Sequence, residues 1–286
     1  MDLMQLRAMA KINLGLDVVR KREDGYHEVR MIMQTIRMFD RVTVYRIPEP
    51  EIRISSNLHF LPVNENNIAY KAARMMLESQ PVRGGVSISL QKRIPVAAGM
   101  AGGSADAAAV LYAMNRIFYM GYTLEELMDF GLRLGADVPY CLMRGTALAE
   151  GIGEKLTKLS PMPHCHIVVA KPPINVSTKM VYESLDAGAI TKHPDIDAII
   201  EAINEGDVKK VAERMGNVLE DVTVPMYPVI AKIKNDMISQ GAYNAMMSGS
   251  GPTVFGIFPD EQTALKCKEY LKAQEDARQV YITETF

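Results

Sequence analysis

Residues 95–106 read PVAAGMAGGSAD, a run of small residues that links a predicted strand to a predicted helix. Residues 86–91, just before it, alternate apolar and polar side chains with the two-residue period of a half-buried strand. Residues 107–118, just after it, place apolar side chains at helical spacing. Free backbone N–H groups and the positive end of the helix dipole would therefore meet in the loop, which favours a bound phosphate.

The glycines of this stretch indicate what kind of phosphate loop it is. Three of them permit positive φ angles and close approach of the backbone to a ligand: Gly99, Gly102 and Gly103. The stretch lacks the Gly-Lys-Ser/Thr ending of a Walker A loop and the glycine spacing of a dinucleotide fingerprint. We expect Ser104 or Asp106 to cap the helix and Gly121 to end it. A flexible turn without a ligand is the alternative interpretation of the motif alone.

Composition and charge describe an ordinary folded protein that does not bind polyanions. The chain has 286 residues, enough for two lobes, with 48% hydrophobic and 23% charged residues. A net charge of −2 and the lack of a long Lys/Arg run argue against nucleic acid or an anionic membrane as a partner. Three cysteines without metal-type spacing are expected to be reduced thiols: Cys141, Cys165 and Cys267. With no signal-peptide layout and no long apolar segment, we expect a cytoplasmic location.

The opening segment predicts a strand with two polar side chains on one face. Residues 6–18 place an apolar side chain at every second position, which predicts one apolar face. Lys11 and Asn13 lie at the intervening positions, on the opposite face of the strand. The strand-like runs at 28–36 and 41–47 then suggest an antiparallel meander. Between them and the opening strand lies a turn at residues 24 and 25, with Tyr26 and His27 beside it.

Helix signals surround the phosphate loop. Residues 66–79 read as one helix, and Thr123 with Glu126 forms a capping box that opens another, which Gly135 closes. Asp137 follows this stop directly and precedes a Val-Pro pair, so its carboxylate would project from a turn beside the loop. A simple turn or cap aspartate is the alternative.

The second half of the chain predicts a separate lobe. Residues 161–163 read Pro-Met-Pro and mark a boundary between lobes 1–161 and 162–286. Beyond it the predicted order is βαββαβ, which is ferredoxin-like, interrupted by a helical block at about 177–221. The two inner strands are joined by SGSGP at 248–252, whose simplest role is a tight hairpin connection. The predicted elements are strands 166–170, 242–247, 253–258 and 279–283, and helices 227–239 and 261–274.

Three motifs, in this order, resemble those of the GHMP kinases (galactokinase, homoserine, mevalonate and phosphomevalonate kinases). They are AKIN from Ala10, PVAAGMAGGSAD from Pro95 and SGSGPTVFG from Ser248. The resemblance spans the whole chain and implies an α+β fold of two lobes. The N-terminal ATP-binding lobe would be ribosomal-protein-S5-domain-2-like, and the C-terminal lobe ferredoxin-like with a helical insertion. It also implies an ATP-dependent small-molecule kinase, with Mg²⁺ carried by the ATP phosphates.

Within this family, three longer stretches look closest to the branch that acts in non-mevalonate isoprenoid precursor synthesis. They are AKINLGLDVVRKREDGYHE from Ala10, LGADVPYC from Leu134 and ALAEGIGE from Ala147. The resemblance implies transfer of the γ-phosphoryl group of ATP to the 2-hydroxyl of a methylerythritol unit that carries a cytidine diphosphate group. No nucleic acid or membrane partner is expected, and the enzyme would be a monomer or homodimer.

Phosphoryl transfer requires a positioned nucleophile, a proton acceptor and positive charge or N–H donors on the moving group. Asp137 matches the family's catalytic aspartate and is the candidate general base. Lys11 matches the catalytic lysine, although a solvated strand lysine is the commoner fate of such a residue. An ammonium within hydrogen-bonding reach would keep Asp137 ionised and could orient the acceptor hydroxyl.

The acceptor contacts are expected from the opening strand, the first turn and the helical block. Tyr26 and His27 offer the stacking and base-edge hydrogen bonds that a cytosine requires, or are packed hairpin residues. Asn13 can hydrogen-bond a polyol, or is satisfied by water at a strand edge. By the resemblance, Tyr182 closes over the cytosine from the other side with Thr178 nearby; the alternative for Tyr182 is a core aromatic.

The nucleotide contacts implied by the resemblance come from the loop and from three residues outside it. The loop residues are Pro95, Val96, Ala97, Ala98, Gly99, Met100, Ala101, Gly102, Gly103, Ser104 and Ala105. Asn67, Ile68 and Lys92 match positions that line the adenine pocket, with helix-start and strand-end roles as alternatives. Alanines at 97, 98 and 101 replace glycines of many members, which would limit φ and fix the loop. Because Ser104 is followed by alanine where several relatives have a second serine, no protein ligand of Mg²⁺ is assigned.

Two other functions stay open at this point. The loop and SGSGPTVFG alone do not exclude another GHMP kinase of the homoserine or mevalonate type, and the GYHE turn at 25–28 is what discriminates against it. A non-catalytic nucleotide-binding or RNA-binding module is the second alternative. The near-neutral charge argues against RNA, and Lys11 together with Asp137 argues against a pseudoenzyme.

Overall fold

The computed structural model describes residues 2–286. The chain divides into two compact units that alternate along the sequence. The first contains the residues up to Ala10, Met38–Val96 and Ala101–Arg144, and the second contains Lys11–Arg37, Ala97–Met100 and Gly145–Phe286. The two long strands β1 (Leu3–Lys21) and β2 (His27–Ile47) contribute residues to both units. The lobe boundary at residue 161 stays a prediction.

Strand β2 is one continuous element, so the prediction of two separate strands at 28–36 and 41–47 is wrong. The interval contains Asp40, a residue that is depleted in strands. The carboxylate of Asp40 is fully buried and accepts hydrogen bonds from the backbone N–H of Ile94 (2.8 Å) and from the ammonium of Lys92. These partners replace water, and the strand therefore continues through the aspartate.

Strand β1 is buried on both faces at its centre, which the alternating pattern did not predict. Every residue from Ala8 to Leu16 is buried, including Lys11 and Asn13, which were expected on the polar face. At Gly15 an added Cβ would lie 2.7 Å from Cδ1 of Ile196, a residue of helix α6 (Ile196–Glu205). The helix therefore lies against the strand at the one position where the strand has no side chain.

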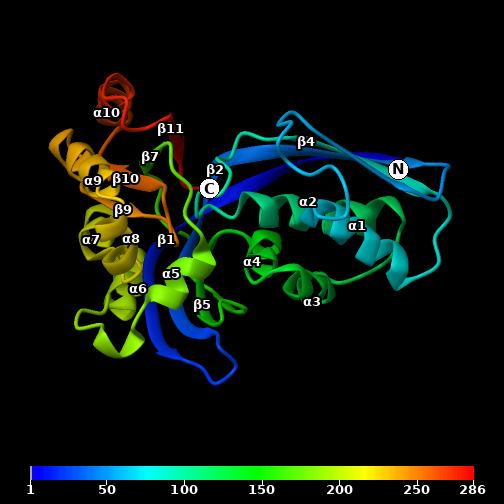
Figure 1. The fold of residues 1–286 in the computed structure, drawn as a ribbon, viewed down its shortest axis with the longest axis horizontal. Helices are drawn as coiled ribbons and strands as arrows, with labels where there is room; N and C mark the ends of the chain where they lie inside the picture. Colours follow the sequence, from blue (N-terminus) through cyan, green and yellow to red (C-terminus); the bar gives the residue numbers. More distant parts are fainter. Residues whose placement is uncertain (1) are drawn as a thin grey trace. The chain divides into compact units, whose positions relative to one another are not determined.

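The first unit places helices against strands (Figure 1). Strand β4 (Gly85–Gln91) pairs antiparallel with the second half of β2 and parallel with β3 (Ile52–Ser56), a strand that was not predicted from the sequence. The helices are α1 (Ile68–Ser79), α2 (Gly102–Ile117), α3 (Leu124–Leu134) and α4 (Asp137–Met143). Helix α2 packs against each of the other three, so the segment after the phosphate loop is the centre of this helical layer.

Two of these helices were predicted well. Helix α1 begins two residues later than the predicted 66–79, with Asn67 as its N-cap, and Thr123 with Glu126 forms the expected capping box of α3, which ends at Gly135. The predicted ends of α2 are wrong: the helix begins at Gly102 after an uncapped Ala101, and it ends at Ile117 rather than near Gly121. Its early end has a local cause, because the Asn115 side chain binds both the N–H and the C=O of Tyr122.

The second unit adds short strands to the second half of β1 and to the first half of β2. Strand β5 (Thr146–Gly151) pairs antiparallel with β2 and with β6 (Lys155–Lys158), and β8 (Gly216–Asn217) pairs parallel with β1 at Gly15 and Leu16. The helical block consists of α5 (Thr178–Ser184), the 3₁₀ turn η1 (Ala187–Ala189), α6, α7 (Val208–Arg214) and α8 (Glu220–Met226).

A four-stranded antiparallel sheet in the second unit confirms the ferredoxin-like prediction. Its order is β11-β7-β10-β9, which is the fourth, first, third and second strand of a βαββαβ unit. The strands are β7 (His166–Lys171), β9 (Asn244–Met247), β10 (Val254–Phe258) and β11 (Gln279–Glu284). Helices α9 (Val229–Ser239) and α10 (Glu261–Ala273) lie along this sheet and contact each other (Figure 1). Within residues 2–286, no helix is both long and apolar enough to cross a bilayer.

Candidate active site

The phosphate loop combines three left-handed residues with an uncapped helix start. The φ angles are +50° at Ala97, +69° at Gly99 and +57° at Ala101. The expectation that alanines would limit φ is therefore wrong at positions 97 and 101, because both adopt the conformation that favours glycine. Helix α2 has no side-chain N-cap, and its first backbone hydrogen bond runs from Ala105 N–H to Ala101 C=O (2.8 Å). The N–H groups of the preceding turn thus have no acceptor within the helix and are available to an anion.

The SGSGP segment does more than connect β9 and β10. The Ser248 hydroxyl donates to the carbonyl of Gly99 (3.0 Å) at the middle of the phosphate loop. A Cβ added to Gly99 would lie 2.1 Å from the Ser248 carbonyl oxygen, and one added to Gly249 would lie 3.2 Å from the Gly99 oxygen. The two small-residue loops therefore pack backbone against backbone, which accounts for glycine at positions 99 and 249. The sequence suggests only a hairpin role for Ser248, and this contact has no local signal in it.

Lys11 and Asn13 form a buried polar pair, so neither the solvated lysine nor the water-satisfied asparagine is correct. Lys11 is 5% exposed and Asn13 is 0% exposed. The Lys11 ammonium donates to Asn13 Oδ1 (2.8 Å), and the Asn13 amide contacts the sulfur of Met31 at 3.2 Å. The backbone N–H of Lys11 donates to the carbonyl of Met100 (3.2 Å), which ties this part of β1 to the phosphate loop.

Asp137 lies in the first unit as the first residue of α4, not in a turn. It is half-buried, and its carboxylate forms no hydrogen bond or ion pair within residues 2–286. Pro139 occupies the first turn of the same helix, where a missing N–H removes no intrahelical bond. The carboxylate is thus held on a rigid element and keeps its acceptor capacity for another group.

The structure brings His27 and Tyr182 together as an aromatic pair. Their ring centroids are 5.3 Å apart with an interplanar angle of 40°. His27 is 7% exposed, and its Nε2 atom has no hydrogen-bond partner within the described residues. Burial lowers the pKa of His27, and the positive charge of Lys21 lowers it further. A neutral imidazole with one unused ring nitrogen can act as donor or acceptor toward a heterocycle.

Tyr26 and Thr178 are placed differently from this pair. Tyr26 is 61% exposed at the tip of the hairpin, where its backbone N–H donates to the Asp24 carboxylate (3.1 Å). Thr178 is the first residue of α5, and its hydroxyl lies 2.8 Å from the hydroxyl of Ser250. Thr178 and Tyr182 thus share one helix, and Thr178 connects that helix to the SGSGP segment.

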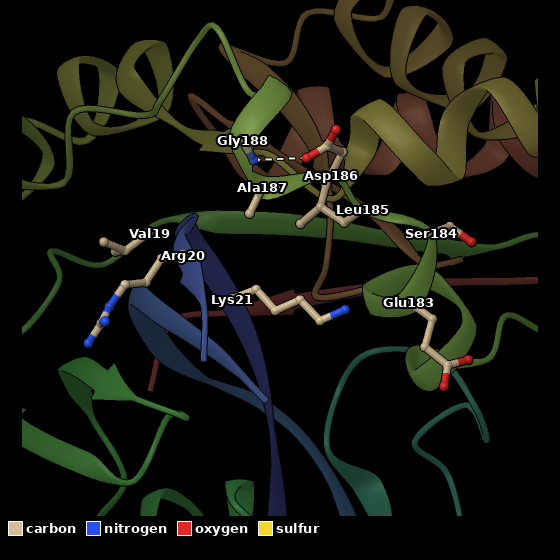
Figure 2. Close-up of a pocket in the computed structure, with 9 residues that line it drawn as sticks. All are labelled: Val19, Arg20, Lys21, Glu183, Ser184, Leu185, Asp186, Ala187 and Gly188. Carbon is tan, nitrogen blue, oxygen red and sulfur yellow. Dashed lines mark hydrogen bonds between the residues drawn. The ribbon is translucent and has the colours of Figure 1, made fainter. Parts of the chain in front are cut away.

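A pocket of about 440 Å³ lies at the end of β1, beside α5 and η1 (Figure 2). Figure 2 shows Lys21 extending from the strand toward the helix that carries Glu183, while Asp186 turns back to accept a hydrogen bond from Gly188 N–H (3.0 Å). The pocket is lined by two cationic side chains, Arg20 and Lys21, and by two carboxylates, Glu183 and Asp186. It therefore favours no single class of ligand, although its lysine is the charge that acts on His27.

The three residues predicted near adenine already have structural partners. The Asn67 side chain accepts from Ala69 N–H (2.9 Å) and donates to the Pro62 carbonyl (2.8 Å), so both of its ends are used. Ile68 begins α1, and its Cγ2 would lie 3.5 Å from a Cβ at Gly103, which places it against the start of α2. The Lys92 ammonium is bound by two buried carboxylates. Their contacts with adenine stay predictions.

Comparisons with known proteins agree with this architecture. Residues 67–145 match the GHMP kinases N terminal domain and residues 199–277 match the GHMP kinases C terminal domain. The 4-diphosphocytidyl-2-C-methyl-D-erythritol kinase of Lachnospira eligens is 63% identical over 286 residues, covering 100% of this chain and 99% of the relative. The enzyme of the same name from Lachnoclostridium phytofermentans is 52% identical, covering 100% and 98%.

Solved structures give the same result. A crystal structure of 4-(cytidine 5'-diphospho)-2C-methyl-D-erythritol kinase aligns with a TM-score of 0.84 at 33% identity and covers 99% of both chains. A homoserine kinase from Cytophaga hutchinsonii aligns with a TM-score of 0.79 at 20% identity, covering 99% of this chain and 95% of its own, and this likeness concerns the fold alone. Because relatives of this identity cover the full length and both family domains match, the chain is a kinase that belongs to the GHMP family.

Proposed function

We propose that this kinase transfers the γ-phosphoryl group of ATP to the 2-hydroxyl of 4-diphosphocytidyl-2-C-methyl-D-erythritol. The observation that best supports this acceptor is the pairing of buried His27 with Tyr182, which offers an aromatic surface of two rings inclined at 40° and one unused ring nitrogen. A cytosine presents a planar ring with donor and acceptor groups on its edge, and such a surface suits it. The names of the full-length relatives support the same acceptor.

The triphosphate would occupy the loop at 95–105. Left-handed backbone at Ala97, Gly99 and Ala101 and the free amides of the first turn of α2 supply N–H donors without a lysine of the Walker A type. No group of three His, Cys, Asp or Glu side chains suited to a metal ion occurs within residues 2–286. Magnesium commonly binds through substrate phosphates and water with one or two carboxylates, so we assign it to the nucleotide.

In this proposal Asp137 accepts the proton of the acceptor hydroxyl. The new bond forms between that hydroxyl oxygen and the γ-phosphorus, and the bond between the γ-phosphorus and the leaving oxygen of ADP breaks. Lys11 would orient the hydroxyl and balance developing charge, with Asn13 holding the ammonium and reaching the polyol. Tyr26 and Thr178 complete the acceptor contacts. Residues 1–161 would form the ATP-binding lobe and residues 162–286 the second lobe.

Cys165 and Cys267 are buried thiols that form no disulfide, which fits a reducing compartment, and we propose the cytoplasm as the location. Homoserine and mevalonate kinases share the fold at 20% identity or less, and they remain the competing acceptor classes.

An acceptor panel tests the assignment. Purified protein is incubated with ATP, Mg²⁺ and, separately, 4-diphosphocytidyl-2-C-methyl-D-erythritol, homoserine and mevalonate, and ADP release and phosphorylated product are measured. We expect product from the cytidine-bearing acceptor alone. Product only from homoserine or mevalonate would refute the proposed acceptor while leaving the family assignment intact.

A further inference from the structure

Three ionisable side chains of the first unit form a buried cluster close in sequence to the two ends of the phosphate loop. Asp40 of β2 is 0% exposed, Lys92 after β4 is 8% exposed and Asp106 of α2 is 3% exposed. The Lys92 ammonium donates to Asp40 and, at 2.5 Å, to Asp106 Oδ2. The cluster therefore joins three elements through a single nitrogen.

The cluster brackets the loop in sequence. Lys92 lies three residues before Pro95, and Asp106 is the fifth residue of α2, just beyond the loop. The main chain of Lys92 is fixed as well, since its N–H donates to Asn57 Oδ1 (2.7 Å) and its C=O accepts from the Asn57 amide (3.2 Å). Asp40 also accepts the N–H of Ile94 (2.8 Å), the next buried residue toward the loop. Both the entry and the exit of the loop are thus held by one ionic group.

Stability alone does not explain such a cluster. Removing ionisable groups from water has a large desolvation cost, and a well-packed apolar replacement is often equally stable. The Asp106 Oδ1 atom has no hydrogen-bond partner within residues 2–286, which adds a further cost. The cluster instead provides a fixed orientation. A hydrogen-bonded ammonium restricts the position of Asp106, and with it the position of α2, more tightly than apolar packing does.

The helix start rests against the same ammonium. A Cβ added to Gly102, the first residue of α2, would lie 3.5 Å from Lys92 Nζ and 3.1 Å from Ile94 Cγ2. The helix turn that presents free N–H groups to the loop is therefore in contact with the cluster. A displacement of Lys92 or Asp106 would move those N–H groups.

We propose that Asp40, Lys92 and Asp106 are positioning residues for the nucleotide: together they fix the first turn of α2 so that its N–H groups point at the phosphates of ATP. The inference rests on the proposed ATP site but not on the identity of the acceptor. It also gives Lys92 a different role from the adenine contact expected from the sequence, because its ammonium acts through Asp106.

The experiment compares three variants by their affinity for AMPPNP, measured calorimetrically without acceptor at a temperature where each is folded. Asp106→Ala removes the oxygen that Lys92 binds, whereas Asp106→Asn keeps an oxygen in place. Asn115→Ala is the matched control, because it removes two hydrogen bonds to Tyr122 at the far end of the same helix. We expect Asp106→Ala to weaken AMPPNP binding and raise KM for ATP about tenfold or more, with KM for the acceptor within about twofold. Asp106→Asn and Asn115→Ala should stay within about threefold of the parent protein in both quantities.

Two results would overturn the proposal. One is an Asp106→Ala protein that melts at a lower temperature but binds AMPPNP as tightly as the parent. The other is an equal loss of affinity in Asn115→Ala, which would mean that general loosening of the helix is responsible. If Asp106→Ala does not fold, Asp106→Ser, whose hydroxyl is too short to replace the carboxylate, takes its place with the same expectations. A parent protein that binds AMPPNP but phosphorylates no cytidine-bearing acceptor would refute the proposed substrate and leave this test valid.

Discussion

At the scale of single residues, the proposed chemistry depends on two polar groups in different surroundings. Lys11 is almost fully buried with Asn13 as its partner, while Asp137 keeps a carboxylate without partners among the described residues at the start of α4. These two side chains are therefore prepared for different tasks. A buried ammonium is a fixed source of positive charge, and an unengaged carboxylate can accept a proton.

Replacing Asp137 by asparagine tests the proton acceptor. Asp137→Asn keeps the size of the side chain but removes its basicity, so we expect kcat to fall by about 10²- to 10⁴-fold. The affinity for AMPPNP should change by less than about threefold, because the nucleotide donors lie elsewhere in the chain. Steady-state kinetics and calorimetry measure the two quantities. Turnover equal to that of the parent protein would exclude Asp137 from the mechanism.

Asp106 makes the stability of the protein depend on pH. Burial raises the pKa of Asp106 from 3.8 to about 7, against the opposing pull of the Lys92 charge. A carboxyl group with a raised pKa binds its proton more tightly in the folded state, so its favourable contribution is complete below about pH 4 and is lost as the pH rises through 7.

The side chain of the Asp106→Asn variant cannot titrate. We expect the unfolding free energy of Asp106→Asn to rise relative to the parent protein between pH 4 and pH 8, by an amount on the order of 3 kcal/mol. Urea denaturation at a series of pH values measures the difference. A difference that does not vary with pH would show that Asp106 has an ordinary pKa in the folded protein.

At the scale of elements, the phosphate loop stores backbone strain next to a long helix. Ala97 and Ala101 adopt left-handed conformations that cost an alanine about 1–2 kcal/mol each. Strain of this kind concentrates at ligand-binding segments, where it fixes one backbone shape. The alanines therefore make the loop rigid by a different route from the one expected, since they occupy the unusual φ values rather than avoiding them.

Relief of that strain is measurable. Ala101→Gly should raise the unfolding free energy by about 0.5–1 kcal/mol, because the relief exceeds the entropy cost of an added glycine. Ala107→Gly, in the interior of α2, should lower it by about 1 kcal/mol. Urea denaturation measures both changes in unfolding free energy, and the dependence of that free energy on urea concentration should be the same in each variant as in the parent protein. A loss of stability in Ala101→Gly would contradict a strained alanine at this position.

Elements whose ends are decided locally were predictable from the sequence, whereas those decided by distant contacts were not. The capping box at Thr123 involves residues three apart, and it was confirmed together with the stop at Gly135. The continuity of β2 depends on Asp40, whose partners Lys92 and Ile94 are more than fifty residues away. No local pattern around Asp40 distinguishes it from an aspartate in a turn.

At the scale of the whole molecule, the proposed function places acceptor and nucleotide contacts in different parts of the chain. Motifs predicted the family, the ferredoxin-like sheet and the order of its elements, because these depend on patterns spread over many residues. The contact between Ser248 and Gly99 was not predictable, since it joins two loops 149 residues apart. Glycine content signalled that both backbones approach something closely, but not that they approach each other.

Tyr26 tests the separation of the two substrates. Tyr26→Ala should raise KM for 4-diphosphocytidyl-2-C-methyl-D-erythritol by about 10-fold or more through the loss of stacking, with KM for ATP within about twofold. Tyr119→Ala, which removes a tyrosine that is 76% exposed in the first unit, should leave both constants unchanged. Initial-rate kinetics with each substrate varied in turn measure them. Equal increases for both substrates would show that the hairpin does not select the acceptor.

The alternation of the two units along the sequence sets an order for folding during synthesis. All residues of the first unit have been made once Arg144 is added, whereas Lys11–Arg37 belong to a unit whose remaining parts run to the last residue. Domains generally form as their residues leave the ribosome, N-terminal first. Here the early segments of β1 and β2 emerge long before β5 and β8 exist to pair with them. In the nascent chain, this edge of β2 therefore stays unpaired until Gly151 is made, and that of β1 until Asn217 is made. These are the surfaces that a chaperone would be expected to cover.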